Sequence, residues 1–430
     1  MDTFEVSLKK EHTTQAKSWT KHLGSVLIEK YFKMVNFAQY MSPGIYVKEQ
    51  AENQRYTELA NHIHIYLFGT ATAGDDAVPV RVRSLAEFRS AYGEDSPSDK
   101  YVQLIFENDR TALLYFVRIP DLSPPEDTIL SAIDVEDNYA PGFLIAPELF
   151  ETTAEATERK TIGDALINLA ESRDYFTIID PGADIAGIDA VKTERGQYQT
   201  QKGHAAFYYP YLLGAGAEPQ TFAPSAAIAA VATRRIKEEG LRPPAGAKYP
   251  IRGVTAVAER ILTTQQDELN PEGINVIRNI RNLGIVVWGM RTLATEILYR
   301  FVHYRIVMNV VNYSFRRGML EEELFDLIDG ENMLMARVKA KAVSIGRQLF
   351  RSGLLYGTTE DDAYAVVCDF TNNTLEDLQK GDILVEFYAA IAPALEKLLI
   401  TSVPVTIGRV GEAAANGIAR DEVVVESQLG

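Results

Sequence analysis

The chain has 430 residues, 46% hydrophobic and 24% charged, which is an ordinary globular composition with room for two or three domains. Its formal net charge of −16 argues against a nucleic-acid-binding protein, because such proteins gain affinity by neutralising phosphates. The single cysteine, Cys368, excludes an internal disulfide and a cysteine-rich metal site. No apolar run is long enough to span a membrane and no secretory signal is recognisable, so we expect a soluble protein without direct membrane insertion.

The first 60 residues contain no pattern of a folded domain. Residues 1–40 carry six lysines among polar residues, which predicts a loose extension. Residues 41–60 are expected to form a linker arm, because Ile45 and Val47 alternate with Tyr46 after a Pro-Gly turn signal. This extended segment has no neighbouring strand in the sequence, so its backbone donors must pair elsewhere, for example in another chain.

The next two segments are predicted to contain most of the strands. Residues 61–140 are expected to form a β-rich domain, with a helix that begins at Ser84 and has Glu87 three residues later, as in a capping box. Residues 141–293 alternate between strand and helix patterns, which favours an α/β layer with a largely parallel sheet. The expected strands here are 143–146, 175–180, 205–212 and 284–289, with helices over 162–172 and 226–239.

The remainder of the chain is predicted to be α+β. Residues 294–400 contain two long helical patterns, 295–316 and 332–351, followed by strand patterns over 363–369 and 383–391. Residues 401–430 are expected to form a C-terminal arm, with Val403, Val405 and Ile407 on one face of a strand, and an acidic tail from residue 411. The predicted fold is therefore a mixed α/β and α+β protein with extended terminal arms.

No constellation of catalytic, cofactor-binding or metal-binding residues stands out. A phosphate-binding loop and the motifs Gly-x-Ser-x-Gly and His-Glu-x-x-His are absent, and Gly214 and Gly216 favour a flexible loop over a nucleotide site. His62 and His64 have no third ligand nearby, which favours a half-buried strand over a metal site. Cys368 lies in an apolar strand, where a buried hydrophobic role is more typical than a nucleophile. We therefore expect no enzyme activity, cofactor or metal.

One charge pattern is unusual for an acidic protein. At helical spacing, Arg337, Lys341 and Arg351 follow one flank of the apolar stripe within 332–351. The pattern fits either a solvated helix face or a docking surface for an acidic partner.

Several motifs resemble the phage tail sheath family, and the similarity runs from about residue 41 to residue 407. The most specific stretch is Ile274-Asn-Val-Ile-Arg278 followed by Gly284-Ile-Val-Val-Trp-Gly-Met-Arg-Thr-Leu293, which includes Trp288, Gly289 and Arg291. A second stretch is similar to the C-terminal domain of the family and includes Val367-Cys-Asp-Phe-Thr-Asn-Asn-Thr374. Independently of the family, Arg291 offers a fixed fork for a carboxylate, and Asn372 and Asn373 after Asp369 favour a side-chain-bonded turn.

The resemblance implies a structural subunit whose middle domain is subtilisin-like. Such a subunit would stack in hexameric rings as a helical polymer around an inner tail tube, and would also contact baseplate and tail terminator proteins. Its terminal arms would add strands to neighbouring subunits, the basic helix would dock on the tube, and contraction would drive the tube through a target envelope. The resemblance places it in a virion tail or injection particle, assembled in the host or producer cytoplasm. The alternatives are an α/β hydrolase-like enzyme and a non-contracting tail structural protein.

Overall fold

The computed structural model describes residues 59–400, except 121–123, 134–138, 218 and 331. The expected arm strands, with Ile45, Tyr46 and Val47 at one end and Val403, Val405 and Ile407 at the other, lie outside the described residues, as do residues 1–40 and 411–430.

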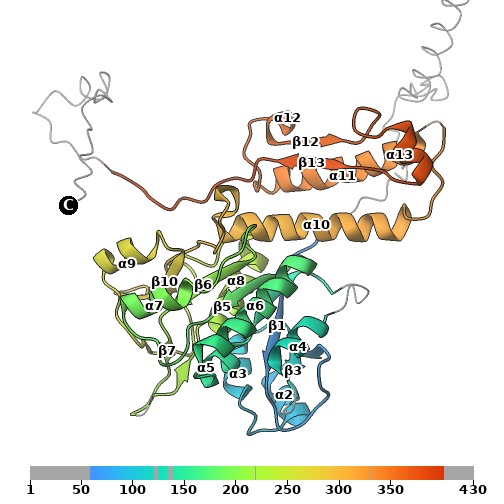
Figure 1. Ribbon diagram of the computed structural model, residues 1–430. Coiled ribbons are helices and arrows are strands. Elements are labelled where there is room, and N and C mark those ends of the chain that lie inside the picture. The colour runs from blue at the N-terminus through green and yellow to red at the C-terminus, as the bar shows by residue number, and fades with distance from the viewer. Residues whose placement is uncertain (1–58, 121–123, 134–138, 218, 331, 401–430) are drawn as a thin grey trace, which may run out of the picture. The chain divides into compact units, whose positions relative to one another are not determined.

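An eight-stranded sheet forms the centre of the described chain, in the order β11-β10-β6-β5-β4-β1-β3-β2 (Figure 1). Neighbours from β10 to β3 pair in parallel, whereas β2 and β11 are antiparallel edge strands. The expectation of a mixed fold with a mostly parallel central sheet is therefore confirmed. The strands are β1 (His64–Gly69), β2 (Val80–Val82), β3 (Leu113–Arg118), β4 (Gly142–Ile145), β5 (Phe176–Ile179), β6 (Ala205–Tyr209), β10 (Ile274–Ile280) and β11 (Gly284–Val287).

Helices cover both faces of this sheet, because successive side chains of each central strand point to opposite faces and both are apolar. In β1, Ile65 and Leu67 belong to one buried cluster, and Tyr66 and Phe68 belong to the other. Helices α2 (Leu85–Tyr92), α3 (Asp99–Asn108) and α8 (Ser225–Glu239) contribute to the first cluster. Helices α4 (Pro125–Ser131), α5 (Pro147–Thr152), α6 (Ala156–Arg173), α7 (Ile188–Arg195) and α9 (Thr263–Leu269) contribute to the second.

The segment 61–140 does not form a sheet of its own, in contrast to the expected β-rich domain. Strand β1 pairs with β3 on one side and with β4 on the other, so the two expected domains share one sheet. The sequence pattern could not show this, because the pairing of β1 with β4 joins residues about eighty positions apart in the sequence. Three short strands form a separate small sheet: β7 (Leu212–Leu213), β8 (Thr221–Phe222) and β9 (Ala256–Val257).

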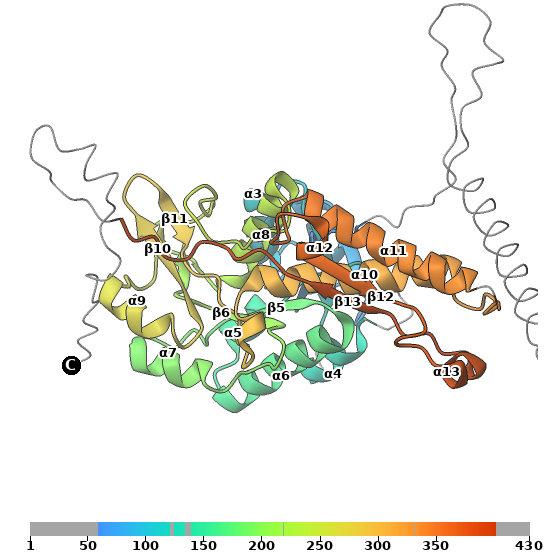
Figure 2. The same cartoon turned by 90° about the horizontal axis from the view of Figure 1, so that it is seen from above.

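The C-terminal part consists of two long helices and a two-stranded sheet (Figures 1 and 2). Helix α10 packs on the first buried cluster through Val302, Ile306 and Val310. The short helix η2 precedes α10, which begins later and ends later than the 295–316 predicted from the apolar pattern. The elements are η2 (Ile297–Tyr299), α10 (Val302–Glu322), α11 (Met333–Arg351), α12 (Glu360–Ala363), β12 (Tyr364–Val367), α13 (Leu375–Lys380) and β13 (Glu386–Ala389).

Candidate functional site

The signature around Trp288 lies where the chain leaves β11 and runs alongside β10. An added Cβ on Gly289 would approach Oδ1, Cα and Cβ of Asn275 to 2.7–2.9 Å, so only glycine fits at this separation. The fully buried Asn275 side chain accepts from the backbone N–H of Arg291 (2.7 Å) and donates to the carbonyl of Arg291 (2.6 Å). It also donates to the carbonyl of Phe207 on β6 (3.1 Å). Asn275 thus fixes the backbone that carries the Arg291 side chain.

The Arg291 guanidinium binds a carboxylate from the segment that follows β13. Its Nε and Nη2 donate to the two carboxylate oxygens of Glu396 at 2.9 and 3.0 Å, and Nη1 donates to the carbonyl of Asn270 at 3.0 Å. The Asn270 side chain donates a further bond to Glu396 (3.0 Å). Burial opposes ionisation of Glu396, but the hydrogen bonds from Arg291 and Asn270 hold the pKa of that carboxyl below its usual value. The motif predicts a carboxylate partner for Arg291, but the roles of Glu396, Asn270 and Asn275 depend on contacts between segments distant in the sequence.

Trp288 itself is 39% exposed and borders a hollow of about 850 Å³ between the central layer and residues 393–397. Its backbone N–H donates to the carbonyl of Val276 (2.8 Å), and its carbonyl accepts from the side chain of Gln266 (3.0 Å). Trp288 therefore lies partly exposed at the edge of the hollow.

Asn372 and Asn373 lie in the turn that follows β12 and precedes α13. Asn372 Oδ1 accepts from the backbone N–H of Asp369 (3.1 Å), and the Asp369 carboxylate accepts from the N–H of Thr371 (3.0 Å). The buried Asn373 side chain exchanges hydrogen bonds with both backbone groups of Leu384 (2.6 and 3.0 Å). The two asparagines thus tie the end of β12 to the start of β13.

The C-terminal sheet leaves strand edges open. Strands β12 and β13 pair antiparallel with each other, from Tyr364 opposite Ala389 to Val367 opposite Glu386. Within the described part of the chain, no further strand joins either outer edge of this sheet. Such an edge offers unpaired N–H and carbonyl groups to an additional strand.

The basic side chains of α11 are mostly neutralised within the chain. Lys341 is only 7% exposed, and its ammonium lies 2.7 Å from carboxylate oxygens of both Glu322 and Glu323. Arg337 pairs with Glu323 (3.1 Å) and with Asp326. The expected docking role does not fit Lys341, because Glu322 and Glu323 at the C-terminal end of α10 pair with it. Of the three basic residues, Arg351 is exposed and has no ion-pair partner among the described residues.

The histidines and the cysteine do not form a reactive cluster. His62 precedes β1 and contacts Phe143 edge-on, whereas His64 stacks near Tyr66 on the other face, so the two imidazoles do not converge. Across the described residues, no group of three histidine, cysteine or acidic side chains is placed to hold a metal ion. Cys368 is buried, which raises the pKa of its thiol. Burial lowers the pKa of His62 to about 3.

One Ser–Asp pair lies at the carboxyl end of the parallel sheet. Asp180 follows β5, and its carboxylate accepts hydrogen bonds from the N–H and the hydroxyl of Ser225 at the start of α8 (2.8 and 2.5 Å). Both residues are fully buried, and burial raises the pKa of Asp180 to about 7. The pair therefore caps a helix and offers no group to a substrate.

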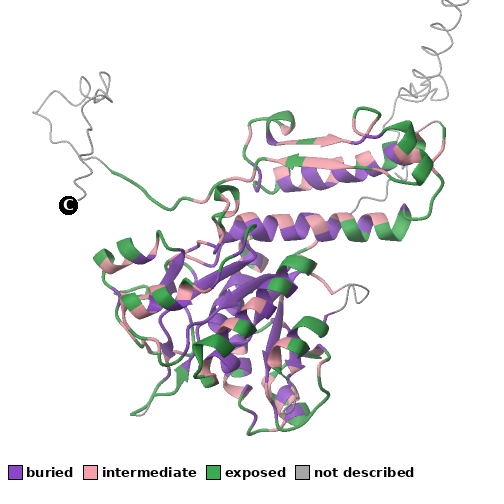
Figure 3. Cartoon of the chain, in the orientation of Figure 1, coloured by how far each residue is buried: buried purple, intermediate pink, exposed green. Residues whose placement is uncertain are grey.

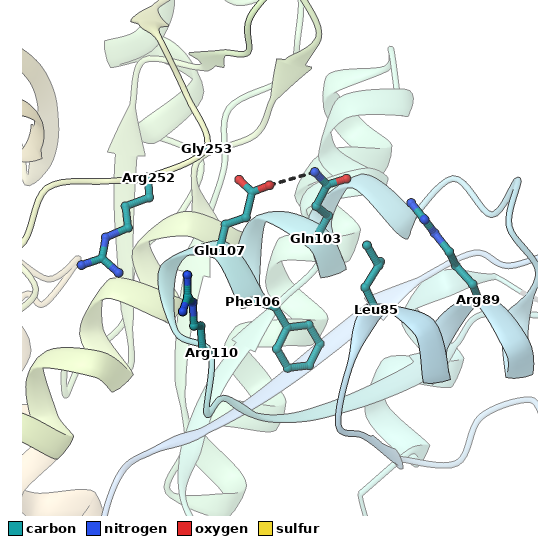
Figure 4. A pocket seen from close by; sticks show the side chains of 8 residues that line it. All are labelled: Leu85, Arg89, Gln103, Phe106, Glu107, Arg110, Arg252 and Gly253. Atoms are coloured by element: carbon teal, nitrogen blue, oxygen red, sulfur yellow. Dashed lines mark hydrogen bonds between the residues drawn. The ribbon is translucent and has the colours of Figure 1, made fainter.

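A surface hollow of about 600 Å³ lies between α2, α3 and the loop at Gly253 (Figure 4). Its side chains include Glu107, which accepts from Gln103 (2.8 Å), and the exposed Arg110 and Arg252. No nucleophile with an adjacent base lines it. Neither this hollow nor the Ser–Asp pair supports the hydrolase alternative.

Among the described residues, no helix is long and apolar enough to cross a membrane. No curated protein sequence matches the chain. The structure resembles a chain of the helical sheath of the anti-feeding prophage in the contracted state, with a TM-score of 0.68 and 23% identity over 84% of this chain and 99% of that chain. It also resembles the PVC sheath complex of an extracellular contractile injection system in the contracted state (TM-score 0.66, 22% identity, 84% and 97% covered). A sheath tail protein from Desulfitobacterium hafniense matches with a TM-score of 0.51 and 10% identity over 75% of this chain and 93% of that chain.

These likenesses show a shared fold. Residues 127–293 match the family model described as the phage tail sheath protein central domain. Residues 127–293 therefore match the central domain of the phage tail sheath family, and the described chain shares the fold of contractile sheath proteins, which confirms the resemblance indicated by its motifs.

Proposed function

We propose that this chain is a sheath subunit that polymerises as stacked hexameric rings around an inner tail tube and contracts to drive the tube through a target envelope. The observation that carries the proposal is the open-edged sheet β12–β13 in a chain with the fold of contractile sheath proteins. Each edge can accept an arm strand, and main-chain hydrogen bonds give such pairing strength without demanding a particular sequence.

Exposed apolar side chains near the tip of α10 also favour a polymer. Leu320, Leu324, Phe325 and Leu327 are each more than half exposed, and they border a hollow of about 970 Å³ next to α13. Exposed apolar patches of this kind mark protein–protein contacts, because leaving them in water is unfavourable. A neighbouring subunit would cover them in a ring or between rings.

In this proposal the arm segments with Ile45, Tyr46 and Val47, and with Val403, Val405 and Ile407, link neighbouring subunits. The tube-docking surface on α11 reduces to Arg351 and the partly exposed Arg337, because Lys341 is buried in ion pairs. Baseplate and tail terminator proteins would contact the ends of the polymer. The subunit would store energy in lattice contacts that differ between two packings, with no enzymatic step.

The test compares the polymer formed by the intact chain with that formed by Tyr46→Pro, a change that removes a backbone donor from the arm. Val423→Pro is the matched control, since it places proline beyond the arm strand. Electron microscopy should show long striated tubes for the intact chain and for Val423→Pro, and none for Tyr46→Pro. Tubes from all three would refute linkage through this arm, and a strict monomer with hydrolytic activity would favour the enzyme alternative.

A further inference from the structure

The segment after β13 is attached to the rest of the chain in two different ways. Up to Ala392 its backbone is held firmly, since Ala392 donates to the carbonyl of Leu354 (2.8 Å) and its carbonyl bonds His303 Nε2 (3.1 Å). From residue 393 to residue 400 the backbone makes no hydrogen bond to any described residue. This stretch, which we name the strap, runs past α9 and β10 (Figures 1 and 2).

Apolar packing does not explain why the strap lies on the central layer. Leu395, Leu398, Leu399 and Ile400 are each more than 70% exposed, and the strap is coloured as exposed along most of its length in Figure 3. The hollow of about 850 Å³ separates part of the strap from Trp288 and Met290. Little apolar area is therefore removed from water when the strap is seated.

The polar attachment of the strap to described residues runs through one side chain, Glu396. Its carboxylate accepts two bonds from Arg291 and one from Asn270, and the Glu396 and Arg291 side chains are only 24% and 13% exposed. Bidentate arginine–carboxylate pairs of this type are both strong and directional. Arg291 is itself fixed, because Asn275 holds its backbone and the Asn270 carbonyl accepts from Nη1.

We propose that Arg291 and Asn270 form a clasp that positions the strap through Glu396, giving the strap a seated and a released position. The clasp sets the direction in which the chain continues from residue 400 toward Val403, Val405 and Ile407. This consequence rests on the proposed function: a seated strap would aim the C-terminal arm at one neighbour, and release would let the arm follow that neighbour when the packing changes. Arg291, Asn270 and Glu396 are positioning residues, and the exposed apolar strap side chains would meet the neighbour.

The test measures the mobility of a nitroxide label at Leu399→Cys in full-length protein that carries Cys368→Ala. Dilution, checked by sedimentation, keeps the chain monomeric, so that a neighbour cannot hold the arm. Electron paramagnetic resonance should show a restricted label with the clasp intact and a mobile one in Glu396→Gln and Arg291→Gln. Loss of the charged pair should raise the released population by about tenfold or more, since one charged hydrogen bond changes an equilibrium by at least that factor.

Lys397→Gln is the matched control, because it also removes one strap charge but breaks no described ion pair. It should leave the spectrum unchanged, and Arg291→Lys, which keeps the charge but loses the fork, should be intermediate. The midpoint of thermal unfolding of Glu396→Gln should stay that of the parent, which separates positioning from general stability. An unchanged spectrum in both clasp variants, or equal release in Lys397→Gln, would overturn the clasp. Release of the strap in both clasp variants, together with a parent chain that forms no tubes, would uphold the clasp and refute the proposed function.

Discussion

Asn275 should be among the most stability-critical polar residues of the central layer. Replacing it with alanine removes the partner of three backbone groups: the N–H and carbonyl of Arg291 and the carbonyl of Phe207. Asn275 is fully buried, so water does not replace the lost bonds without rearrangement. Each buried group left unpaired costs about 1–3 kcal/mol, and relaxation makes the costs less than additive, so we expect a loss of about 3–5 kcal/mol.

The assay is urea-induced unfolding followed by circular dichroism at pH 7. Asn279→Ala is the matched control, because Asn279 lies on the same strand with an exposed side chain, and its loss should cost no more than about 0.5 kcal/mol. Asn275→Asp should also destabilise, since a carboxylate keeps the bond from the Arg291 N–H but faces two carbonyl oxygens. A loss below about 1 kcal/mol for Asn275→Ala would refute the role assigned to this side chain.

Three further predictions follow from the same contacts. Gly289→Ala should lower the free energy of unfolding by about 1–3 kcal/mol, because the added Cβ would lie under 3 Å from Asn275. A variant as stable as the parent would contradict this close approach. Lys341→Ala should lower the unfolding midpoint of the C-terminal part, at a cost of about 3 kcal/mol, because Glu323 loses a buried partner. Arg351→Ala should have little effect, since Arg351 is exposed. Equal effects of the two substitutions would refute this contrast. Stability should fall as the pH drops from about 6.5 toward 4. Burial lowers the pKa values of four histidines to about 3–4, so the unfolded chain binds protons at a higher pH than the folded chain does. These are His62, His64, His204 and His303. The raised pKa of Asp180 acts in the opposite direction over part of this range, so His62→Gln should flatten the measured pH dependence and Asp180→Asn should steepen it.

Local patterns predicted the elements of the central layer well. Alternation of buried strands and helices indicated a mostly parallel sheet, and the Ser84 hydroxyl does accept from the N–H of Glu87 at the start of α2 (3.1 Å). The Glu87 side chain bonds the N–H of Arg83 rather than that of Ser84, so the capping box is incomplete. These successes rest on interactions between residues close in sequence, where spacing alone carries the information.

Long-range pairing could not be predicted in the same way. The pairing of β1 with β4, which merges two expected domains, depends on strand order, and strand order leaves no trace in local periodicity. The carboxylate that binds Arg291 is 105 residues away in the sequence. The guanidinium of Arg291 therefore predicted that a carboxylate would bind there but did not identify Glu396. The basic residues on α11 suggested a docking surface. Lys341 is instead neutralised by Glu322 and Glu323, which come close to it only because the chain turns back between α10 and α11.

The central claim is that terminal strands of one subunit complete sheets in its neighbours. Cryo-electron microscopy of the intact chain, compared with a chain that lacks residues 1–47 and 401–430, tests it most directly. We predict striated cylinders for the intact chain, with additional strands on the outer edges of β12 and β13, and dispersed subunits for the trimmed chain. Normal cylinders from the trimmed chain, able to shorten like those of the intact one, would contradict the account.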